Sequence, residues 1–228
     1  MWEFGARRRR LTRRTKFYWH DYRFKNYVRT MQYLAELREG GKIKHVGLTN
    51  FDTNCMQEML DGGVKPAMNQ VQYSLLDRRP ENRMVAWCEA NDVPLLPFGV
   101  AAGGFLSEKY LGVDPRSVEL NTYSKSKYAS VIQQSGGWAW FQQLLGALQG
   151  IGQKHGASIT NVAARWVLDK PVVPAIIIGA RNAAHVADHA ALMQLQLDDE
   201  DRALIQGVLD EGKPPRQDVY SWERGGEF

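Results

Sequence analysis

The chain has 228 residues, of which 44% are hydrophobic and 24% charged, and its formal net charge is +4. This length is typical of one globular domain, and the composition excludes a disordered or collagen-like chain. No apolar run reaches the roughly 18 residues of a membrane span, so we expect no membrane contact. Only two cysteines occur, which is typical of a reducing, cytoplasmic setting.

The positive charge is concentrated at the N-terminus. The basic side chains of this segment, against Glu3 alone, are Arg7, Arg8, Arg9, Arg10, Arg13, Arg14 and Lys16. We interpret residues 1–16 as a solvated, disordered tail. Without interleaved aromatic residues or a nucleic-acid-binding motif, we do not expect a nucleic-acid partner. The alternative interpretation is an arm that binds nucleic acid or an anionic surface.

Strand and helix patterns alternate through the first half of the chain. Apolar residues at helical spacing predict one helix over residues 24–37, and Asp52 or Thr53 is expected to cap another that ends at Gly62-Gly63. Pro80 is expected to open a third. The predicted strands are Phe17–His20, Lys44–Asn50, Ala67–Tyr73 and Val93–Gly99.

The second half continues the alternation after a long irregular stretch, residues 100–136. The helices predicted there are 138–155, one capped by Ser158 or Thr160, 182–193, and one that runs from Asp198 to Gly212. A fifth strand is predicted at Ala175–Ala180. Alternating strands and helices indicate an α/β fold with parallel strands in one domain, residues 17–212, followed by an irregular tail, residues 213–228.

Polar side chains end two successive predicted strands. Thr49-Asn50 follows His45–Leu48, and Gln70 lies within Ala67–Tyr73. In a parallel β/α fold the carboxyl ends of the strands build the site, so these side chains are candidate site residues.

Five segments, taken together and in order, resemble the aldo-keto reductases, and most closely their aryl-alcohol-dehydrogenase-like branch. They are HVGLTNFD (45–52), NQVQYSLLDRRP (69–80), FGVAAGGFLSEKYLG (98–112), KHGASITNVAARWVLD (154–169) and IIIGARNAAHVADH (176–189). The resemblance implies a (β/α)8 TIM barrel, NADP(H) as the cofactor and carbonyl reduction. Only five strands are expected here, so the resemblance implies an incomplete barrel without the first three strand–helix units.

The resemblance also implies roles for individual residues. Thr49 and Asn50 match a Ser-Asn pair that holds the nicotinamide carboxamide, and Gln70 matches a glutamine that assists them. Phe98 falls where a tyrosine usually stacks on the nicotinamide ring, and Gly99 would let the backbone approach the pyrophosphate. At the adenosine end the matching positions hold Arg181 and His185, the latter in place of arginine or glutamine.

Hydride transfer to a carbonyl also needs a proton donor. In the family a tyrosine, a lysine and an aspartate supply it, and all belong to units that we do not expect here. The position of the family's further histidine holds Tyr18, and His20 lies two residues later. Tyr18 and His20 are therefore the candidate catalytic residues. No metal-binding motif occurs, and we interpret Asp77-Arg78-Arg79 as a local ion pair.

Three functions follow as hypotheses. The first is an NADP-dependent oxidoreductase for a small hydrophobic carbonyl or alcohol. The second is a non-redox isomerase, cyclase or dehydratase that uses the remaining pocket. The third is a binding or assembly protein that forms homo-oligomers through the open barrel edge at Phe17–His20. A further hypothesis is that the chain is a fragment of a longer protein.

Overall fold

The computed structural model describes residues 14–19, 22, 24–180, 183–226 and 228. Its regular sheet has three parallel strands in the order β1 (Arg14–Tyr18), β2 (His45–Thr49) and β3 (Asn69–Gln70). Phe17 pairs with Leu48, and Leu48 pairs with Asn69. This regular alternation of strand and helix confirms the α/β class expected from the sequence.

The barrel wall continues past β3 as two extended segments, residues 93–98 and 174–178. Parallel bridges join Asn69 to Leu95 and Phe98 to Ile177, and the Ile177 amide donates to the Pro97 carbonyl at 2.7 Å. The full strands expected at Val93–Gly99 and Ala175–Ala180 do not form among the described residues. Pro94 and Pro97 explain the first of these, because a proline has no N–H to donate to a ladder. The second expected strand, Ala175–Ala180, contains no proline, and Phe98–Ile177 is its one parallel bridge among the described residues.

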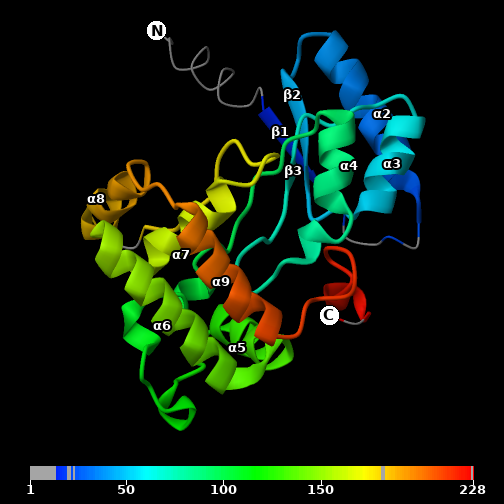
Figure 1. The fold of residues 1–228 in the computed structure, drawn as a ribbon. Helices are drawn as coiled ribbons and strands as arrows, with labels where there is room; N and C mark the ends of the chain where they lie inside the picture. Colours follow the sequence, from blue (N-terminus) through cyan, green and yellow to red (C-terminus); the bar gives the residue numbers. More distant parts are fainter. Residues whose placement is uncertain (1–13, 20–21, 23, 181–182, 227) are drawn as a thin grey trace, which may run out of the picture.

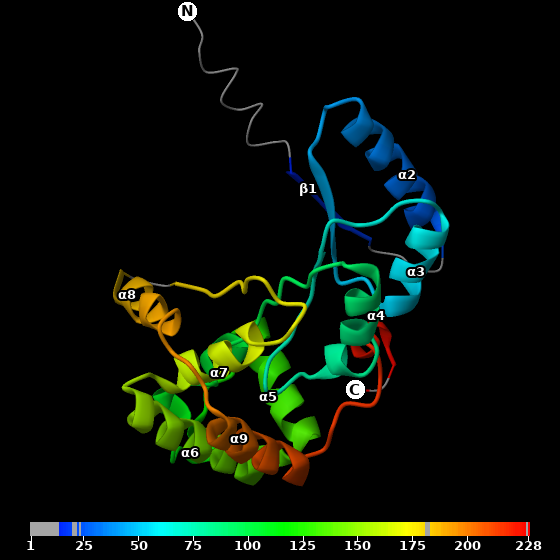
Figure 2. The ribbon, with the colours of Figure 1, turned by 45° about the horizontal axis from the view of Figure 1, so that its top comes forward.

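The helices before residue 92 lie beside the three strands, whereas those after residue 122 pack mainly on one another, away from this sheet (Figures 1 and 2). In chain order they are α2 (Asn26–Glu39), α3 (Thr53–Asp61), α4 (Met84–Asn91), α5 (Tyr123–Ser135), α6 (Gly137–His155), α7 (Ile159–Leu168), α8 (Ala183–Leu192) and α9 (Asp199–Glu211). Short 3-10 helices lie at Arg79–Glu81, Ala102–Gly104, Glu108–Tyr110, Pro115–Ser117 and Trp222–Arg224. No helix within the described residues is long and apolar enough to cross a membrane.

Side-chain caps fix the helix starts that the sequence predicted. The Cys55 amide donates to Asp52 Oδ1 at 2.8 Å, and the Asn161 amide donates to Ser158 Oγ at 3.2 Å. Asp198 and Asp201 form a reciprocal capping box at α9. Each cap satisfies a backbone amide that the first helical turn leaves without a partner.

Several boundaries differ from the expectation. Strand β3 covers only Asn69–Gln70 of the expected Ala67–Tyr73, and Pro80 lies in a 3-10 helix, so that α4 begins at Met84. Strand β1 begins at Arg14 and ends at Tyr18, so residues 14–16 pair with β2 and do not belong to a tail. Helix α5 lies inside the stretch expected to be irregular. Thr122 caps it, and Tyr128, Val131 and Ile132 bury its inner face. Polar residues such as Ser124, Ser126 and Ser130 dilute that apolar pattern in the sequence.

Aromatic side chains join β1, α2 and the loop after β2. The Phe51 ring is fully buried, with ring centroids 5.4 Å from Phe17, 5.4 Å from Tyr22 and 5.9 Å from Tyr27. These contacts hold the N-terminal strand against the rest of the sheet.

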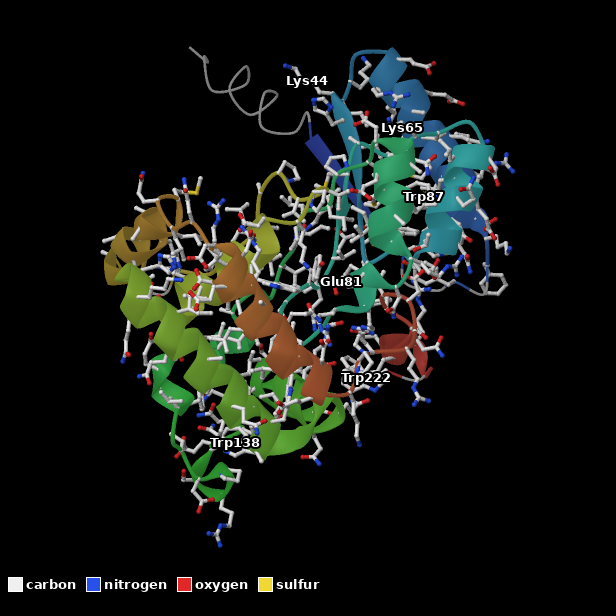
Figure 3. The ribbon with its side chains drawn as sticks, in the orientation of Figure 1. Lys44, Lys65, Glu81, Trp87, Trp138 and Trp222 are labelled. Atoms are coloured by element: carbon white, nitrogen blue, oxygen red, sulfur yellow. The ribbon has the colours of Figure 1, made fainter. Side chains whose placement is uncertain are left out.

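The C-terminal residues 213–228 pack back against the wall. Asn82 Nδ2 donates to the Pro215 and Gln217 carbonyls at 2.9 and 2.7 Å, and the Thr53 amide donates to Asp218 Oδ2 at 2.9 Å. Figure 3 shows Trp222 of this segment on the far side of Glu81 from Lys44 and Lys65, which precede β2 and β3. The C-terminal segment therefore lies at the carboxyl ends of the strands.

Phe51→Ala should lower the free energy of unfolding by about 3–5 kcal/mol, because it removes the buried ring that the other aromatic rings contact. Urea denaturation followed by circular dichroism measures this. Tyr123→Ala, which removes a ring that is 88% exposed, is the matched control and should change stability by less than about 0.5 kcal/mol. Equal effects of the two substitutions would contradict the packing.

Candidate functional site

Three of the expected site residues lie side by side in one row of the sheet. Tyr18 pairs with Thr49, and Thr49 pairs with Gln70. The adjacent row, which contains Phe17 and Asn69, contacts Phe51 beneath the helices. Because successive residues of a strand point to opposite faces, the row of Tyr18, Thr49 and Gln70 points to the barrel interior.

The polar atoms of this row differ in their partners. Gln70 Oε1 accepts a hydrogen bond from Lys16 Nζ at 2.8 Å. The Thr49 hydroxyl is buried and has no partner among the described residues. A buried hydroxyl without a partner is uncommon, so this atom is available to a bound molecule.

Asn50 follows the row in a left-handed backbone conformation, with φ of 59°. Its carbonyl accepts hydrogen bonds from the Tyr22 hydroxyl and from Arg224 Nη2, each at 3.2 Å. Asparagine tolerates this conformation better than most residues, and the two donors hold the turn at the end of β2.

Phe98 and Gly99 lie at the end of the next extended segment. Gly99 has φ of +74°, and a Cβ atom there would collide with the Tyr128 hydroxyl. The glycine thus permits Tyr128 of α5 to approach the wall. Burial, with the nearby charges of Asp77 and Glu223, raises the pKa of Tyr128 to about 12, so its hydroxyl keeps its proton at neutral pH.

A buried ion network lies beside these residues. Arg79 is 1% exposed; its Nε and Nη2 donate to Asp77 at 2.8 and 2.7 Å, and its Nη1 and Nη2 donate to Glu223 at 2.8 and 2.9 Å. Lys127 Nζ donates to Glu223 Oε1 at 3.1 Å. Burial raises the pKa of Glu223, but the hydrogen bonds and charges of Arg79 and Lys127 outweigh it and hold this pKa at about 2.

The C-terminal segment fills the space above the row. Val219, Tyr220 and Glu223 line a cavity of about 20 Å³ whose other lining residues are Asn50, Val71, Gln72, Arg79, Phe98 and Lys127. A cavity of that size holds about one water molecule. A larger hollow of about 700 Å³ lies on another side of the segment, next to Asp52, Asn82 and Arg216.

Of the candidate catalytic residues, the structure describes Tyr18. Its hydroxyl lies 2.8 Å from that of Tyr220, a residue with φ of 65°. Burial, with the hydrogen bond to Tyr18, raises the pKa of Tyr220 to about 12. His20 and Arg181 lie outside the described residues, as does the side chain of His185, whose backbone belongs to α8.

A model of the aldo/keto reductase family matches residues 10–210. The chain belongs to the aldo/keto reductase family. This confirms the resemblance inferred from the sequence motifs.

Among curated proteins, this aldo/keto reductase is similar to the flagellar radial spoke protein 5 of Chlamydomonas reinhardtii. The two are 31% identical over 145 residues, which cover 62% of this chain and 27% of that protein. It is 24% identical to the NADH-specific methylglyoxal reductase of Escherichia coli, covering 79% of this chain and 53% of that one. The chain therefore spans between about a quarter and about half the length of these relatives.

Solved structures confirm the fold class. A glycerol dehydrogenase from Gluconobacter oxydans superposes with a TM-score of 0.75 at 21% identity, over 90% of this chain and 60% of that one. An aldo/keto reductase from Klebsiella pneumoniae, solved in complex with NADP and acetate, superposes with a TM-score of 0.61 at 22% identity and the same coverage. At these identities the likeness shows the fold alone, and that fold is part of a TIM barrel.

Four side chains near the carboxyl ends of the strands were not predicted from the sequence: Lys127, Tyr128, Tyr220 and Glu223. The first two lie on α5, in the stretch expected to be irregular, and the spacing of Tyr128, Val131 and Ile132 was the available signal. The last two lie in the expected irregular tail, where no pattern indicated their contacts. The expected ion pair between Asp77 and Arg79 is present. The sequence did not indicate that Arg79 also pairs with the carboxylate of Glu223.

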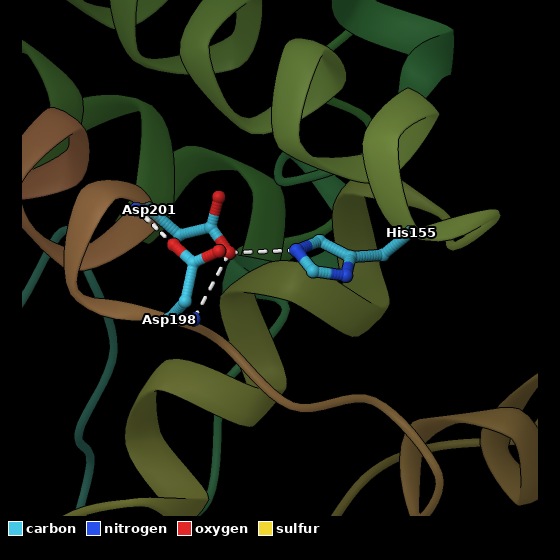
Figure 4. Close-up of side chains that lie close together, drawn as sticks. All are labelled: His155, Asp198 and Asp201. Carbon is cyan, nitrogen blue, oxygen red and sulfur yellow. Dashed lines mark hydrogen bonds and ion pairs between the residues drawn. The ribbon is translucent and has the colours of Figure 1, made fainter.

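A separate cluster of His155, Asp198 and Asp201 has an internal structural role (Figure 4). His155 Nε2 lies 2.6 Å from Asp201 Oδ2, and Lys154 Nζ donates to Asp198 and Asp201 at 2.6 and 2.9 Å. Both carboxylates also accept from backbone amides in the α9 capping box. The ammonium group already supplies the positive charge that a metal ion would bring.

The Glu223 contacts should make stability depend on pH. A carboxylate whose pKa is lowered on folding adds stability above its unfolded pKa, and this contribution is lost as pH falls from about 4.5 to about 2. Glu223→Gln should lower the free energy of unfolding by about 1.5–3 kcal/mol at pH 6 and by close to zero near pH 2. Urea denaturation across this range measures the difference. Glu211→Gln at the end of α9 is the control, and a difference that does not shrink towards acid pH would contradict the assignment.

Proposed function

We propose that this aldo/keto reductase binds a nicotinamide dinucleotide, NADP(H), at the carboxyl ends of β2 and β3 and interconverts a small carbonyl and its alcohol. The observation that carries this proposal is the row of Thr49 and Gln70, in which the Thr49 hydroxyl is buried without a partner. Family membership supports it. The likeness to a methylglyoxal reductase, whose name gives a carbonyl compound as its substrate, supports it further.

The residues present fit a nicotinamide group. A carboxamide offers both a donor and an acceptor, which the Thr49 hydroxyl and the side-chain amides of Asn50 and Gln70 complement. The Phe98 ring offers an apolar face for stacking, and Arg181 and His185 are proposed to hold the adenosine end. When bound, the cofactor supplies or accepts the hydride.

Proton transfer is assigned to the hydroxyls at the mouth. The Tyr18 and Tyr220 hydroxyls share a hydrogen bond of 2.8 Å, through which a proton can pass between the barrel interior and the C-terminal segment. His20 remains a second proposed acid or base on the basis of its place two residues after Tyr18.

Thr49→Val should weaken NADPH binding about tenfold, because it removes a hydroxyl that only the ligand satisfies, worth about 1.4 kcal/mol. The melting temperature should stay the same or rise, since the hydroxyl is an unpaired buried group in the free protein. Thr160→Val is the control; its hydroxyl donates to the Leu106 carbonyl at 2.7 Å, so stability should fall and binding should not change. Isothermal titration calorimetry measures the binding, and thermal denaturation followed by circular dichroism measures the stability. No binding heat in either wild type or Glu223→Gln would contradict the proposal.

Self-association is a second candidate function, favoured by the two end strands of the wall. Among the described residues, strand β1 pairs with β2 alone, and at the other end Ile177 is 40% exposed. Within the described residues no strand pairs with the outer side of residues 174–178. Unpaired edges that carry apolar side chains recruit a further strand. The likeness to a protein named for the flagellar radial spoke supports this candidate.

If the edges associate, wild type should sediment as a dimer at tens of micromolar, and Ile177→Lys should sediment as a monomer. A charged side chain at the edge opposes strand pairing. Leu204→Lys on α9, where the native leucine is 48% exposed, is the matched control and should leave the dimer intact. Sedimentation velocity distinguishes these states, and a monomeric wild type at all concentrations would contradict association.

A further inference from the structure

Glu223 is held as a bound carboxylate is held by a protein. Arg79 presents Nη1 and Nη2 to its two oxygens at 2.8 and 2.9 Å, and Lys127 Nζ adds a third contact at 3.1 Å. Two parallel N–H groups of an arginine are the geometry with which proteins recognise carboxylates. The carboxylate comes from the C-terminal segment, 144 residues from Arg79 along the chain.

The charges of this network balance only while Glu223 is in place. Asp77 and Glu223 carry two negative charges against the two positive charges of Arg79 and Lys127. Without Glu223 the group keeps one net positive charge, on side chains that are 1% and 19% exposed. Arg79 would keep Asp77 as a partner, but Lys127 would lose the carboxylate that it contacts. Excess positive charge in a largely buried position is unfavourable, so the vacated position would attract another anion.

The residues around the Glu223 carboxylate favour a particular kind of anion. The cavity beside Glu223 is also lined by Asn50 and Phe98, the residues assigned above to the nicotinamide group, and by Gln72. Gln72 is 5% exposed, and its Oε1 has no partner among the described residues while its Nε2 donates to Asp77 at 2.7 Å. An acceptor without a partner fits a ligand hydroxyl next to the carboxylate.

We propose that Arg79 and Lys127 form a binding site for the carboxylate of a small hydroxy or oxo acid, which Glu223 occupies as an internal substitute when no such acid is bound. Gln72 Oε1 accepts the hydrogen bond of the hydroxyl in the hydroxy acid. That this acid is the redox substrate rests on the proposed function, whereas the carboxylate site itself does not. Tyr220 and Val219, on the same segment as Glu223, leave the cavity when the acid enters.

Calorimetric titration with lactate and pyruvate, without any dinucleotide, tests the site in the full chain. Both acids should bind Glu223→Ala at least tenfold more tightly than wild type, because the internal competitor is gone. They should also raise the melting temperature of this variant. Lactamide and pyruvamide, which have the same size and no charge, should do neither. Glu211→Ala is the matched control and should bind like wild type.

Adding Lys127→Met to Glu223→Ala should weaken lactate binding at least fivefold, and adding Gln72→Leu should weaken lactate more than pyruvate. If Glu223→Ala does not fold, Glu223→Gln carries the same test, since it keeps the side-chain size and loses the charge. Equal binding of lactate to wild type and both Glu223 variants would overturn the proposal, as would equal binding of lactate and lactamide. Failure here with intact NADPH binding refutes the carboxylate site alone, whereas carboxylate binding without NADPH binding refutes the redox function alone.

Discussion

The buried guanidinium of Arg79 is the constraint on which the arrangement at the carboxyl ends of the strands depends. A charge in that position needs a carboxylate on each side. Asp77 supplies one from the same turn, and Glu223 supplies the other from the end of the chain. Because the second partner is the distant one, the C-terminal segment must lie across the wall for the charge to be balanced. Lys127 extends the same requirement to α5.

This constraint links stability to the occupancy of the site. The closed segment leaves a cavity of about 20 Å³ beside Phe98 and Asn50, which is too small for an organic ligand. Among the described residues, Thr49 Oγ1 and Gln72 Oε1 have no hydrogen-bond partner, and Gln72 lines this cavity. A buried polar atom without a hydrogen-bond partner lowers the free energy of unfolding. A ligand that supplies the missing hydrogen bond removes this cost. The ion pairs of Glu223 hold the C-terminal segment in place and thus oppose the entry of a ligand. A carboxylate ligand can replace Glu223 in these ion pairs and so compensate for their loss.

Much of the fold was predictable because local chemistry determines it. Asp52, Ser158 and Asp198 were expected to cap helices and do so, since a side-chain oxygen three residues before an unpaired amide is a local arrangement. The predicted strand ends at Thr49 and Gln70 also came together, because parallel pairing brings carboxyl ends to one edge. The expected strand at Val93–Gly99 fell short for an equally local reason, the missing N–H groups of Pro94 and Pro97.

The sequence by itself determined the family, the alternation of parallel strands and helices, and the placement of Thr49, Asn50 and Gln70 at strand ends, because each depends on residues close in the chain. Only the tertiary structure decided what lies above those residues. Tyr220 next to Tyr18 and Glu223 on Arg79 are contacts between segments 202 and 144 residues apart. A carboxylate in an irregular segment carries no local mark of the cation it will neutralise. Its partner is set by the path of the whole chain and by the energy of burying the Arg79 charge.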